Sequence, residues 1–205
     1  NSTKDATYQT HYEILVASSM QLLKNDQADI WASGKVASDE SVMVKYTGSE
    51  LQPRSLAFWK VRVGDNHGNV SPWSEPQRFG IGILSNEMWN KSEWIGIKDC
   101  KVPMLRKLFD VSNKNRTHLL HINSLGYHEV YLNGKRVGDH VLAPAVSELD
   151  TRSLSVTYDV TPYLKRGEND LMVWLGRGWY RKQTFNAVHE GPLVRVELDC
   201  IADGK

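Results

Sequence analysis

The ten residues YLNGKRVGDH, Tyr131 to His140, decide how this chain folds. Asn133-Gly134 stands between two runs of residues that favour β-strands. A type I′ turn needs positive φ at both of its central positions, and Asn-Gly meets that need at little steric cost. Val137 continues the return strand, and Gly138-Asp139 ends it. The stretch therefore predicts a tight antiparallel β-hairpin.

Strand patterns surround the hairpin on both sides. Short runs that favour β-structure alternate with turn residues, which is typical of sandwiches and not of alternating strands and helices. Helical periodicity is confined to a turn or two in Ser19–Asp26 and one turn in Thr161–Leu164. We expect an all-β chain with strands at Tyr12–Ala17, Leu56–Val63, Met104–Val111, Thr117–Asn123, Tyr127–Leu132, Leu154–Val160, Leu171–Leu175 and Leu193–Ile201.

Composition and charge exclude several classes of partner. The 205 residues carry 25 Lys and Arg against 24 Asp and Glu, whereas a nucleic-acid-binding protein usually shows a basic surplus or stripe. No run approaches the roughly 20 apolar residues that cross a bilayer, and the N-terminus has no signal-peptide pattern. We therefore expect no nucleic-acid partner and no membrane insertion. Cys100 and Cys200 exclude a disulfide scaffold, and we expect free thiols unless the fold brings them together.

The pattern changes character near Gly80–Asn90, and this divides the chain into two domains. SPWSEPQRFGIG (Ser71–Gly82) ends one series of strands, and WNKSEWIG (Trp89–Gly96) begins another. A chain of this length suits one large domain or two small ones. We expect the first domain to span 1–85 and the second to span 86–205.

The end of the first domain resembles a fibronectin type III domain. FWKVRVGDNHGNVSPWSEPQRF (Phe58–Phe79) combines an alternating strand, a Gly-containing turn and a Ser-Pro-Trp-Ser-Glu-Pro step before a final strand. Trp59, Val61 and Val63 share one face, which we expect to fill the core of a sandwich. The polar start of the chain leaves two possibilities for the opening strand. It is missing or replaced, or it is short and irregular within residues 2–9.

The second domain resembles the jelly-roll, galactose-binding-like domain at the front of several large glycoside hydrolases. The resemblance rests on the Leu-Asn-Gly hairpin together with TYDVTPYLKRGENDLMVWLG (Thr157–Gly176), in which Asp-Val-Thr precedes Gly-Glu-Asn. The closest likeness is to α-L-rhamnosidases of glycoside hydrolase family 78. It extends, in the order of that family, over QTHYEILVASS, DIWASGKVASDES, SEWIG, LGYHEVYLNGKRVGDHVLAPAVSELDTR and GRGWYRK.

Two features depart from the family's pattern. Members often carry Gly-Trp-Thr after the Ala-Pro step, where this chain has Ala145-Val146-Ser147, so an aromatic side chain that could border a sugar pocket is missing. The last residues, IADGK (Ile201–Lys205), resemble a hairpin turn before its return strand. We therefore expect an incomplete jelly roll, truncated at the C-terminus, with an unpaired edge.

The resemblance implies that catalysis lies outside these residues. Glycoside hydrolysis needs two carboxyl groups that flank the scissile bond, and the resembled rhamnosidases are inverting enzymes that carry theirs in an (α/α)6 barrel. The sequence predicts no all-helical segment, so we expect no catalytic residue. Two close pairs of acids, Glu148 with Asp150 and Asp26 with Asp29, are interpreted as solvated polar stretches.

A sugar-binding site is implied by position in the family's motif. Jelly-roll modules of rhamnosidases can bind rhamnose beside a calcium ion, which takes several oxygen ligands. The resemblance assigns Asp139, Asn186 and Pro192 as calcium ligands. Asp139 and Asn186 are also sugar-binding candidates, together with Trp179 and Tyr180, whose rings suit stacking on a pyranose. In the alternative interpretation, Asp139 caps a turn and Trp179 belongs to the core.

The sequence is thus interpreted as the non-catalytic front part of an α-L-rhamnosidase that hydrolyses terminal α-L-rhamnose from plant-derived glycans. The resemblance implies rhamnose-containing glycans and the remaining domains of the parent enzyme as partners, and a periplasmic or extracellular parent. Three alternatives stay open. They are a free-standing carbohydrate-binding module, the front domain of a β-galactosidase-like hydrolase, and an adhesion or cytokine-receptor-like protein. The preceding fibronectin-like domain disfavours the second, and the shortage of cysteines disfavours the third.

Overall fold

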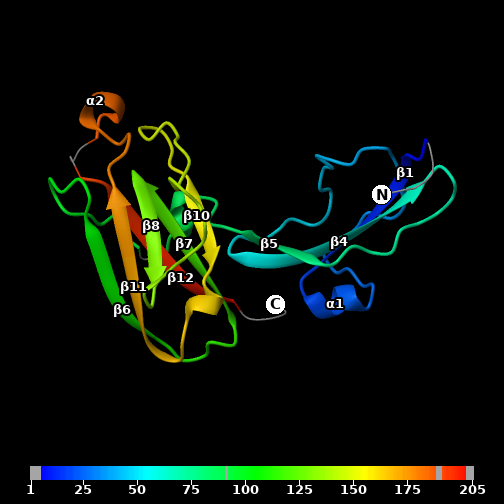
Figure 1. Cartoon of the computed structure of the whole chain (residues 1–205), viewed down its shortest axis with the longest axis horizontal. Coiled ribbons are helices and arrows are strands. Elements are labelled where there is room, and N and C mark those ends of the chain that lie inside the picture. The colour runs from blue at the N-terminus through cyan, green and yellow to red at the C-terminus, as the bar shows by residue number, and fades with distance from the viewer. Residues whose placement is uncertain (1–5, 91, 188–190, 202–205) are drawn as a thin grey trace. The chain divides into compact units, whose positions relative to one another are not determined.

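A computed structural model of the chain describes residues 6–90, 92–187 and 191–201. These residues form two compact units that divide between Ile81 and Gly82 (Figure 1). Strands dominate both units, and no described helix exceeds five residues. The all-β fold class is therefore confirmed. The expected domain limits, 1–85 and 86–205, remain a prediction.

The first unit holds one antiparallel sheet with the order β2-β1-β4-β5, and β3 also pairs with β1. The predicted strands Tyr12–Ala17 and Leu56–Val63 lie within β1 and β4, which pair from Tyr12 opposite Val63 to Ala17 opposite Phe58. Residues 6–8 lie in no strand, and residues 2–5 of the possible opening strand lie outside the described residues. The elements of this unit are β1 (Gln9–Ala17), α1 (Met20–Lys24), β2 (Trp31–Ala32), β3 (Val36–Ala37), β4 (Ser55–Asp65) and β5 (Gln77–Ile81).

Strand β4 buries a lysine. Lys60 is only 5% exposed, and its ammonium group donates to the Leu23 carbonyl and pairs with Asp26. The prediction that Trp59 and the two alternating valines fill the core is wrong at Val63, which is 38% exposed. Helix α1 packs against β4. The Leu23 carbonyl of α1 and the Asp26 carboxylate together compensate the charge of Lys60. Lys60 can therefore be buried on the face of β4 opposite the valines.

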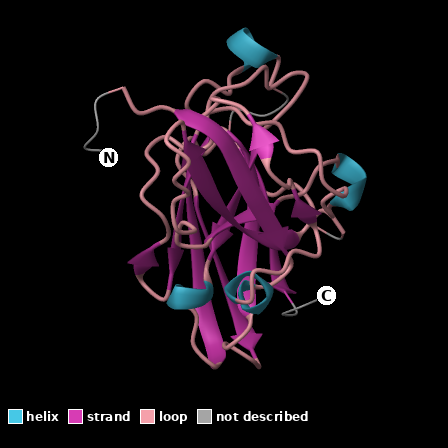
Figure 2. Ribbon diagram, turned by 90° about the vertical axis from the view of Figure 1, so that its right-hand side faces the viewer, coloured by secondary structure: helices cyan, strands magenta, loops and turns pink. Residues whose placement is uncertain are grey.

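The second unit is a sandwich of two antiparallel sheets (Figure 1). Figure 2 shows that strands make up most of the regular structure of the chain. One sheet has the order β10-β7-β12 and the other the order β6-β11-β8-β9. Three predicted strands match the structure residue for residue: Met104–Val111, Tyr127–Leu132 and Leu193–Ile201. The elements are η1 (Asn86–Met88), β6 (Met104–Val111), β7 (Thr117–Leu125), β8 (Tyr127–Leu132), β9 (Lys135–Arg136), β10 (Ser155–Asp159), η2 (Thr161–Tyr163), β11 (Gly167–Gly176), α2 (Lys182–Phe185) and β12 (Leu193–Ile201).

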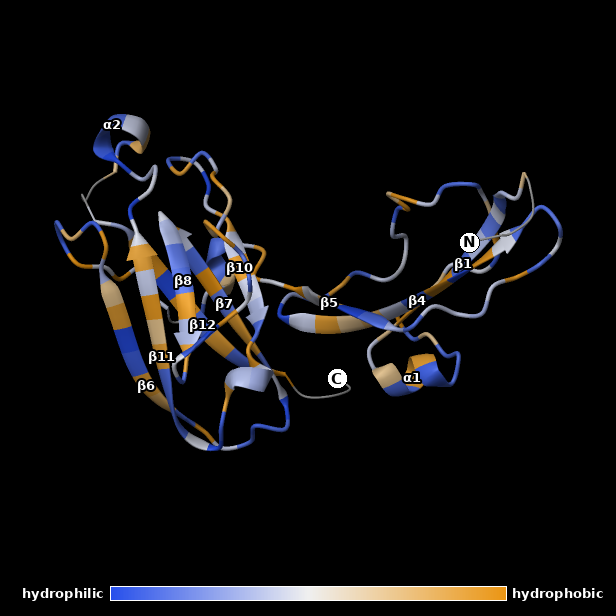
Figure 3. Cartoon of the chain, viewed as in Figure 1, coloured by the Kyte–Doolittle hydropathy of each residue, from blue (hydrophilic) through white to orange (hydrophobic). Residues whose placement is uncertain are grey.

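The core of the second unit lies between its two sheets. Alternation along each strand turns every second side chain inward, and Figure 3 shows apolar residues in the arrowhead half of β11. The buried cluster draws on Ile122 of β7, Leu132 of β8, Val173 of β11 and Val194 of β12, none more than 4% exposed. Each such side chain contributes roughly 1.5–3 kcal/mol on burial. Burial between the sheets therefore holds the sandwich together.

The Asn-Gly hairpin forms as predicted and is fastened to a distant segment. Asn133 has φ 51° and Gly134 has φ 78°, as a type I′ turn requires. The Asn133 side chain donates to the Tyr163 carbonyl and to Asn169 Oδ1, both at 2.9 Å. Its Oδ1 accepts from the Asp170 amide at 3.1 Å. The contact thus joins the Asn of the Leu-Asn-Gly motif to the Asn of the Gly-Glu-Asn motif.

Two smaller expectations concern the membrane and the cysteines. Among the described residues, no helix has the length and apolar character needed to cross a membrane. Cys100 and Cys200 are both free, and Cys200 is exposed. The described part of the second unit is therefore held by packing and hydrogen bonds, without a covalent link.

Candidate functional site

Asp139 lies at the surface directly after the hairpin. Val137 is buried at 5% exposure, and Gly138 turns the chain with φ 70° while its amide donates to the Tyr163 hydroxyl at 3.4 Å. Arg136 donates to the His140 carbonyl at 2.6 Å and closes this turn. The Asp139 side chain is exposed. It is therefore accessible to a ligand.

Trp179 and Tyr180 are neighbours with opposite surroundings. Trp179 is 57% exposed, whereas Tyr180 is 5% exposed. Gly178 precedes them with φ 51° and lies against the Tyr127 ring, where a Cβ would approach to 2.5 Å. The hollow between Trp179 and Tyr127 measures only about 10 Å³. A sugar at this place would have to stack on the outer surface of Trp179, and Tyr180 offers little surface to it.

The remaining predicted residues follow α2. Asn186 is exposed and takes the left-handed conformation, φ 49°, at the end of the helix. Pro192 is fully buried, and its carbonyl oxygen packs against Gly96, where a Cβ would come within 2.5 Å. Asp139 and Asn186 supply oxygen donors of the kind that calcium takes, but the Pro192 carbonyl faces backbone. The three donors fit calcium only in part, and their role stays a prediction.

A metal site built from charged side chains finds no support. Within residues 6–90, 92–187 and 191–201, no group of three or more His, Cys, Asp or Glu side chains is placed to hold a metal ion. The predicted calcium site has a different set of donors. It combines the carboxylate of Asp139 with the amide oxygen of Asn186 and the carbonyl oxygen of Pro192.

The two close pairs of acids have structural surroundings. Glu148 and Asp150 are both exposed, and the Glu148 carbonyl accepts from the Thr151 amide at 2.8 Å within a turn. In the first unit, Asp26 pairs with Lys60, and Asp29 accepts from the Ser18 amide and hydroxyl at 2.8 and 2.6 Å. Asp26 and Asp29 thus have structural partners, and the interpretation of both pairs as non-catalytic stays a prediction.

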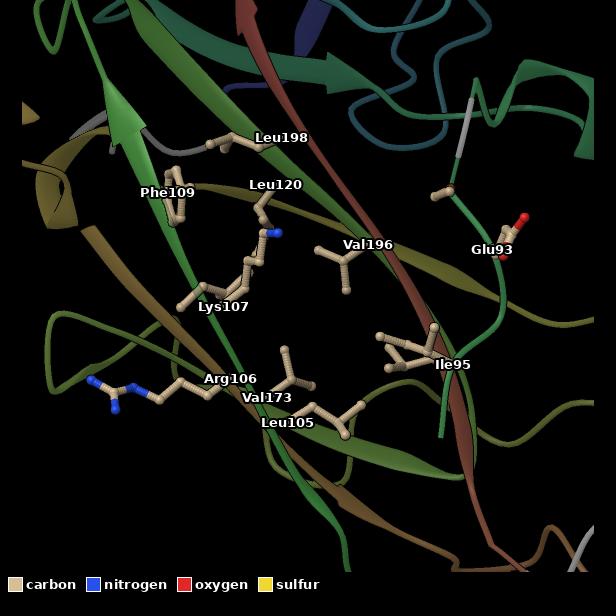
Figure 4. A pocket seen from close by; sticks show the side chains of 13 residues that line it. Glu93, Ile95, Leu105, Arg106, Lys107, Phe109, Leu120, Val173, Val196 and Leu198 are labelled. Carbon is tan, nitrogen blue, oxygen red and sulfur yellow. The ribbon is translucent and has the colours of Figure 1, made fainter. Parts of the chain in front are cut away.

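The second unit also has an open, mostly apolar groove of about 580 Å³. We call it the β6–β12 groove because these two strands each stand at the end of their sheet. Figure 4 shows Leu105 and Phe109 of β6 and Val196 and Leu198 of β12 around one empty space, while Arg106 points away. All four apolar side chains are only partly buried. They continue the core to an open side of the sandwich.

Both strands that border the groove have an edge that the described strands leave unpaired. β6 pairs only with β11, and β12 pairs only with β7, apart from one bridge between Ile95 and Val194. A long unpaired strand edge invites pairing with another strand. Sequence reasoning predicted an unpaired C-terminal edge but not this groove. The alternation of apolar and charged residues in β12 could have indicated its inward residues, but it could not have shown that they stay uncovered.

Both units match family models of N-terminal domains from α-L-rhamnosidase-type proteins. Residues 1–85 match the family described as "Rha78A-like, N-terminal immunoglobulin domain". Residues 113–200 match the family described as "Alpha-L-rhamnosidase N-terminal domain". The two matches follow one another along the chain, in the order that the sequence motifs indicated.

Comparison with known proteins agrees with both matches. An α-L-rhamnosidase of Formosa agariphila is 38% identical over 197 residues, 84% of this chain and 21% of that protein. One of Alteromonas sp. is 32% identical and matches 87% of this chain and 21% of its own length. The chain thus spans about a fifth of these relatives.

Solved structures show the same relation. The structure of an α-L-rhamnosidase from Dictyoglomus thermophilum superposes with a TM-score of 0.84 at 32% identity, over 97% of this chain and 24% of that one. One from Aspergillus terreus gives 0.74 at 28% identity, over 97% and 23%. With both of its units matched in this way, the chain belongs to the α-L-rhamnosidase family and corresponds to the N-terminal region of its members.

Proposed function

We propose that this chain is the non-catalytic front region of an α-L-rhamnosidase and that it supports the catalytic part of the parent protein. The parent removes terminal α-L-rhamnose from plant-derived glycans outside the cytoplasm, in the periplasm or the extracellular medium. The names of the relatives support the reaction. The supporting role rests on one observation, the β6–β12 groove.

The groove suits an internal contact better than solvent. Its lining is mostly apolar, and it continues the core directly, since Leu120 and Val173 at its base are 1% and 4% exposed. An adjoining segment of the parent that presents alternating apolar side chains would pair with an open strand edge and complete the core. The parent's remaining polypeptide is the occupant that we propose, because the relatives are about five times longer than the matched region.

The first prediction concerns a charge placed in the groove of the parent. Phe109→Asp should destabilise the longer parent by about 3 kcal/mol or more, because a covered groove loses the packing of the ring and desolvates the carboxylate, a cost that the neighbouring Lys107 offsets only in part. In the 205-residue chain alone the same change should cost about 1 kcal/mol, because water reaches the groove. Thermal unfolding of both proteins measures the difference.

Leu108→Asp is the matched control for this change. Leu108 is the preceding residue on β6, points outward and is 46% exposed, so the charge should stay solvated in both proteins. If Phe109→Asp lowers the stability of the parent no more than Leu108→Asp does, nothing covers the groove and the supporting role is wrong.

A second candidate function, sugar binding at the predicted residues, is favoured by the exposed ring of Trp179. L-Rhamnose should release heat on binding to the chain in titration calorimetry, and Trp179→Ala should abolish that heat because the stacking surface is removed. Calcium should strengthen binding if Asp139 and Asn186 hold the ion. The absence of heat with and without calcium would contradict this function and leave the supporting role intact.

A further inference from the structure

The Asn133-Gly134 turn of the hairpin contains a side-chain amide that is prone to deamidation. It is the only Asn-Gly pair in the sequence. Glycine has no Cβ, so its backbone nitrogen is the least hindered nucleophile that can follow an asparagine. That nitrogen can attack the side-chain carbonyl carbon of the asparagine and displace ammonia. The turn that the fold requires is thus also a place where the chain can be modified.

The surroundings of Gly134 leave its backbone nitrogen accessible. Gly134 is exposed, and Asn133 is only partly buried. Within the described part of the chain, the space in which a Cβ of Gly134 would lie is open to at least 4 Å. Water, which the second half of the reaction consumes, can therefore reach the turn. Packing around Gly134 does little to hinder the reaction.

The Asn133 side chain, in contrast, is held by three hydrogen bonds. Its Nδ2 donates to the Tyr163 carbonyl and to Asn169 Oδ1, both at 2.9 Å, and its Oδ1 accepts from the Asp170 amide at 3.1 Å. The attack requires Cγ of Asn133 to move towards the Gly134 nitrogen, and this movement breaks all three bonds. The contacts that fix the hairpin therefore also oppose deamidation.

Asn169 makes this protection depend on the fold of the second unit. It lies in β11, 36 positions from Asn133 in the sequence. It is 1% exposed, and its own Nδ2 donates to the carbonyls of Lys165 and Gly167. Its oxygen reaches Asn133 only while β8 and β11 are paired. Opening of the hairpin therefore removes the protection and frees the amide.

We propose that Asn133 is a deamidation site gated by the fold, unreactive while its contact with Asn169 holds and reactive once the hairpin opens. In the first step the Gly134 nitrogen bonds to Cγ of Asn133, the Cγ–Nδ2 bond breaks, and the Gly134 amide proton leaves with Nδ2 as ammonia. Water then opens the succinimide ring at one of its two carbonyls and gives aspartate or isoaspartate. Water is the only co-reactant. The inference does not depend on the proposed activity of the parent.

Either product would disfavour closure of the hairpin. Aspartate at position 133 places an acceptor opposite the Tyr163 carbonyl and Asn169 Oδ1, which accept hydrogen bonds from the amide in the folded chain. Isoaspartate adds a methylene group to the backbone of a tight turn, across which Leu132 pairs with Lys135. An opening that lasts long enough for the reaction thus leaves a second unit that folds less stably than before.

The test compares the 205-residue chain in its folded state with the same chain unfolded in urea, in one mildly alkaline buffer. Mass spectrometry of the tryptic peptide Thr117–Lys135 follows aspartate and isoaspartate at position 133. Deamidation should be about a hundredfold slower in the folded chain, because three hydrogen bonds must break and each accounts for about fivefold.

Asn169→Ala tests whether the contact is the gate. It removes one acceptor and leaves Asn133 and Gly134 unchanged, so the folded variant should deamidate at position 133 about fivefold faster or more, with equal rates in urea. Asn113→Ala is the control, because Asn113 supports a different turn through the Asn115 amide, and it should leave the rate at position 133 unchanged. Should Asn169→Ala fail to fold, the ratio between the folded and unfolded states of the unaltered chain decides.

Asn133→Asp tests the consequence of the reaction. It reproduces one product and should shift the folding equilibrium towards the unfolded state by about tenfold or more, since one acceptor replaces the donor of two hydrogen bonds. Urea unfolding of this variant and the unaltered chain measures the shift.

Three results would overturn the proposal. One is deamidation at position 133 that is equally fast in the folded and unfolded chain, or absent from both. Another is a folded Asn169→Ala variant that reacts at position 133 no faster than the unaltered chain. The third is an Asn133→Asp variant as stable as the unaltered chain.

Discussion

Asn169→Asp should lower the free energy of unfolding of the second unit by about 3 kcal/mol or more. Asn169 is 1% exposed. Its Nδ2 donates to the carbonyls of Lys165 and Gly167 at 2.8 and 2.7 Å, and its Oδ1 accepts from the Lys165 amide and from Asn133 Nδ2 at 2.9 Å. Aspartate keeps the shape but replaces the donor with an oxygen that faces two carbonyl oxygens. A buried charge and two unmatched acceptors result.

Asn113→Asp is the matched control. Asn113 Oδ1 accepts from the Asn115 amide at 3.0 Å in an exposed turn, and a carboxylate accepts equally well there. This change should therefore stay within about 0.5 kcal/mol of the unaltered chain. Calorimetric unfolding of both variants provides the comparison. Equal stability of the two would mean that the Asn133–Asn169 contact does not hold the hairpin in place.

Acid should destabilise the second unit through one buried histidine. Burial, and then the nearby His140, lower the pKa of His128 from 6.5 to about 4. As the pH falls, the unfolded chain binds a proton at His128 before the folded chain does. The contribution of neutral His128 to stability is therefore complete above about pH 6.5 and is lost as the pH falls towards about 4. The shift corresponds to a loss of about 3 kcal/mol across that window.

The surroundings of His128 show why its neutral form is preferred. The side chain is 3% exposed, with Nδ1 2.8 Å from Ser124 Oγ and Nε2 3.3 Å from the Tyr158 hydroxyl. His128→Gln keeps a neutral polar side chain at every pH. Urea unfolding between about pH 7 and about pH 4 should therefore show a smaller loss in this variant, by about 3 kcal/mol. Equal losses in both proteins would show that other groups carry the acid sensitivity.

Local patterns of the sequence predicted most of the fold. Short runs of β-favouring residues between turn residues located β6, β8 and β12 to the residue, and the Asn133-Gly134 turn follows from the φ requirement of its two positions. Short elements escaped prediction, among them β2 and β3 with two residues each. A two-residue strand has no period of its own and forms only because β1 offers it a partner.

Contacts between side chains that are far apart in the sequence could not be predicted from local sequence patterns. The Asn133–Asn169 contact spans 36 positions, and the burial of Lys60 depends on a helix that ends 36 positions before it. Neither has a local pattern. Hydropathy alone makes Lys60 an exposed residue, whereas α1 gives its charge a buried partner.

In the candidate sites, too, the sequence identified some residues correctly but did not show their surroundings. The motif indicated Asp139 and Trp179, and both are exposed, but it equally indicated Tyr180, which is buried. The proximity of Asn123 and Arg195 could not be predicted either, because each residue looks like an ordinary polar position on a strand. Only the pairing of β7 with β12 brings the two together.

The most direct test of the proposed function is the release of rhamnose from an aryl α-L-rhamnoside. The purified 205-residue chain and the longer parent protein are assayed side by side at equal molar concentration. We predict release by the parent and none above the blank by the chain. Rhamnose release by the purified chain alone would contradict the assignment of this region as non-catalytic.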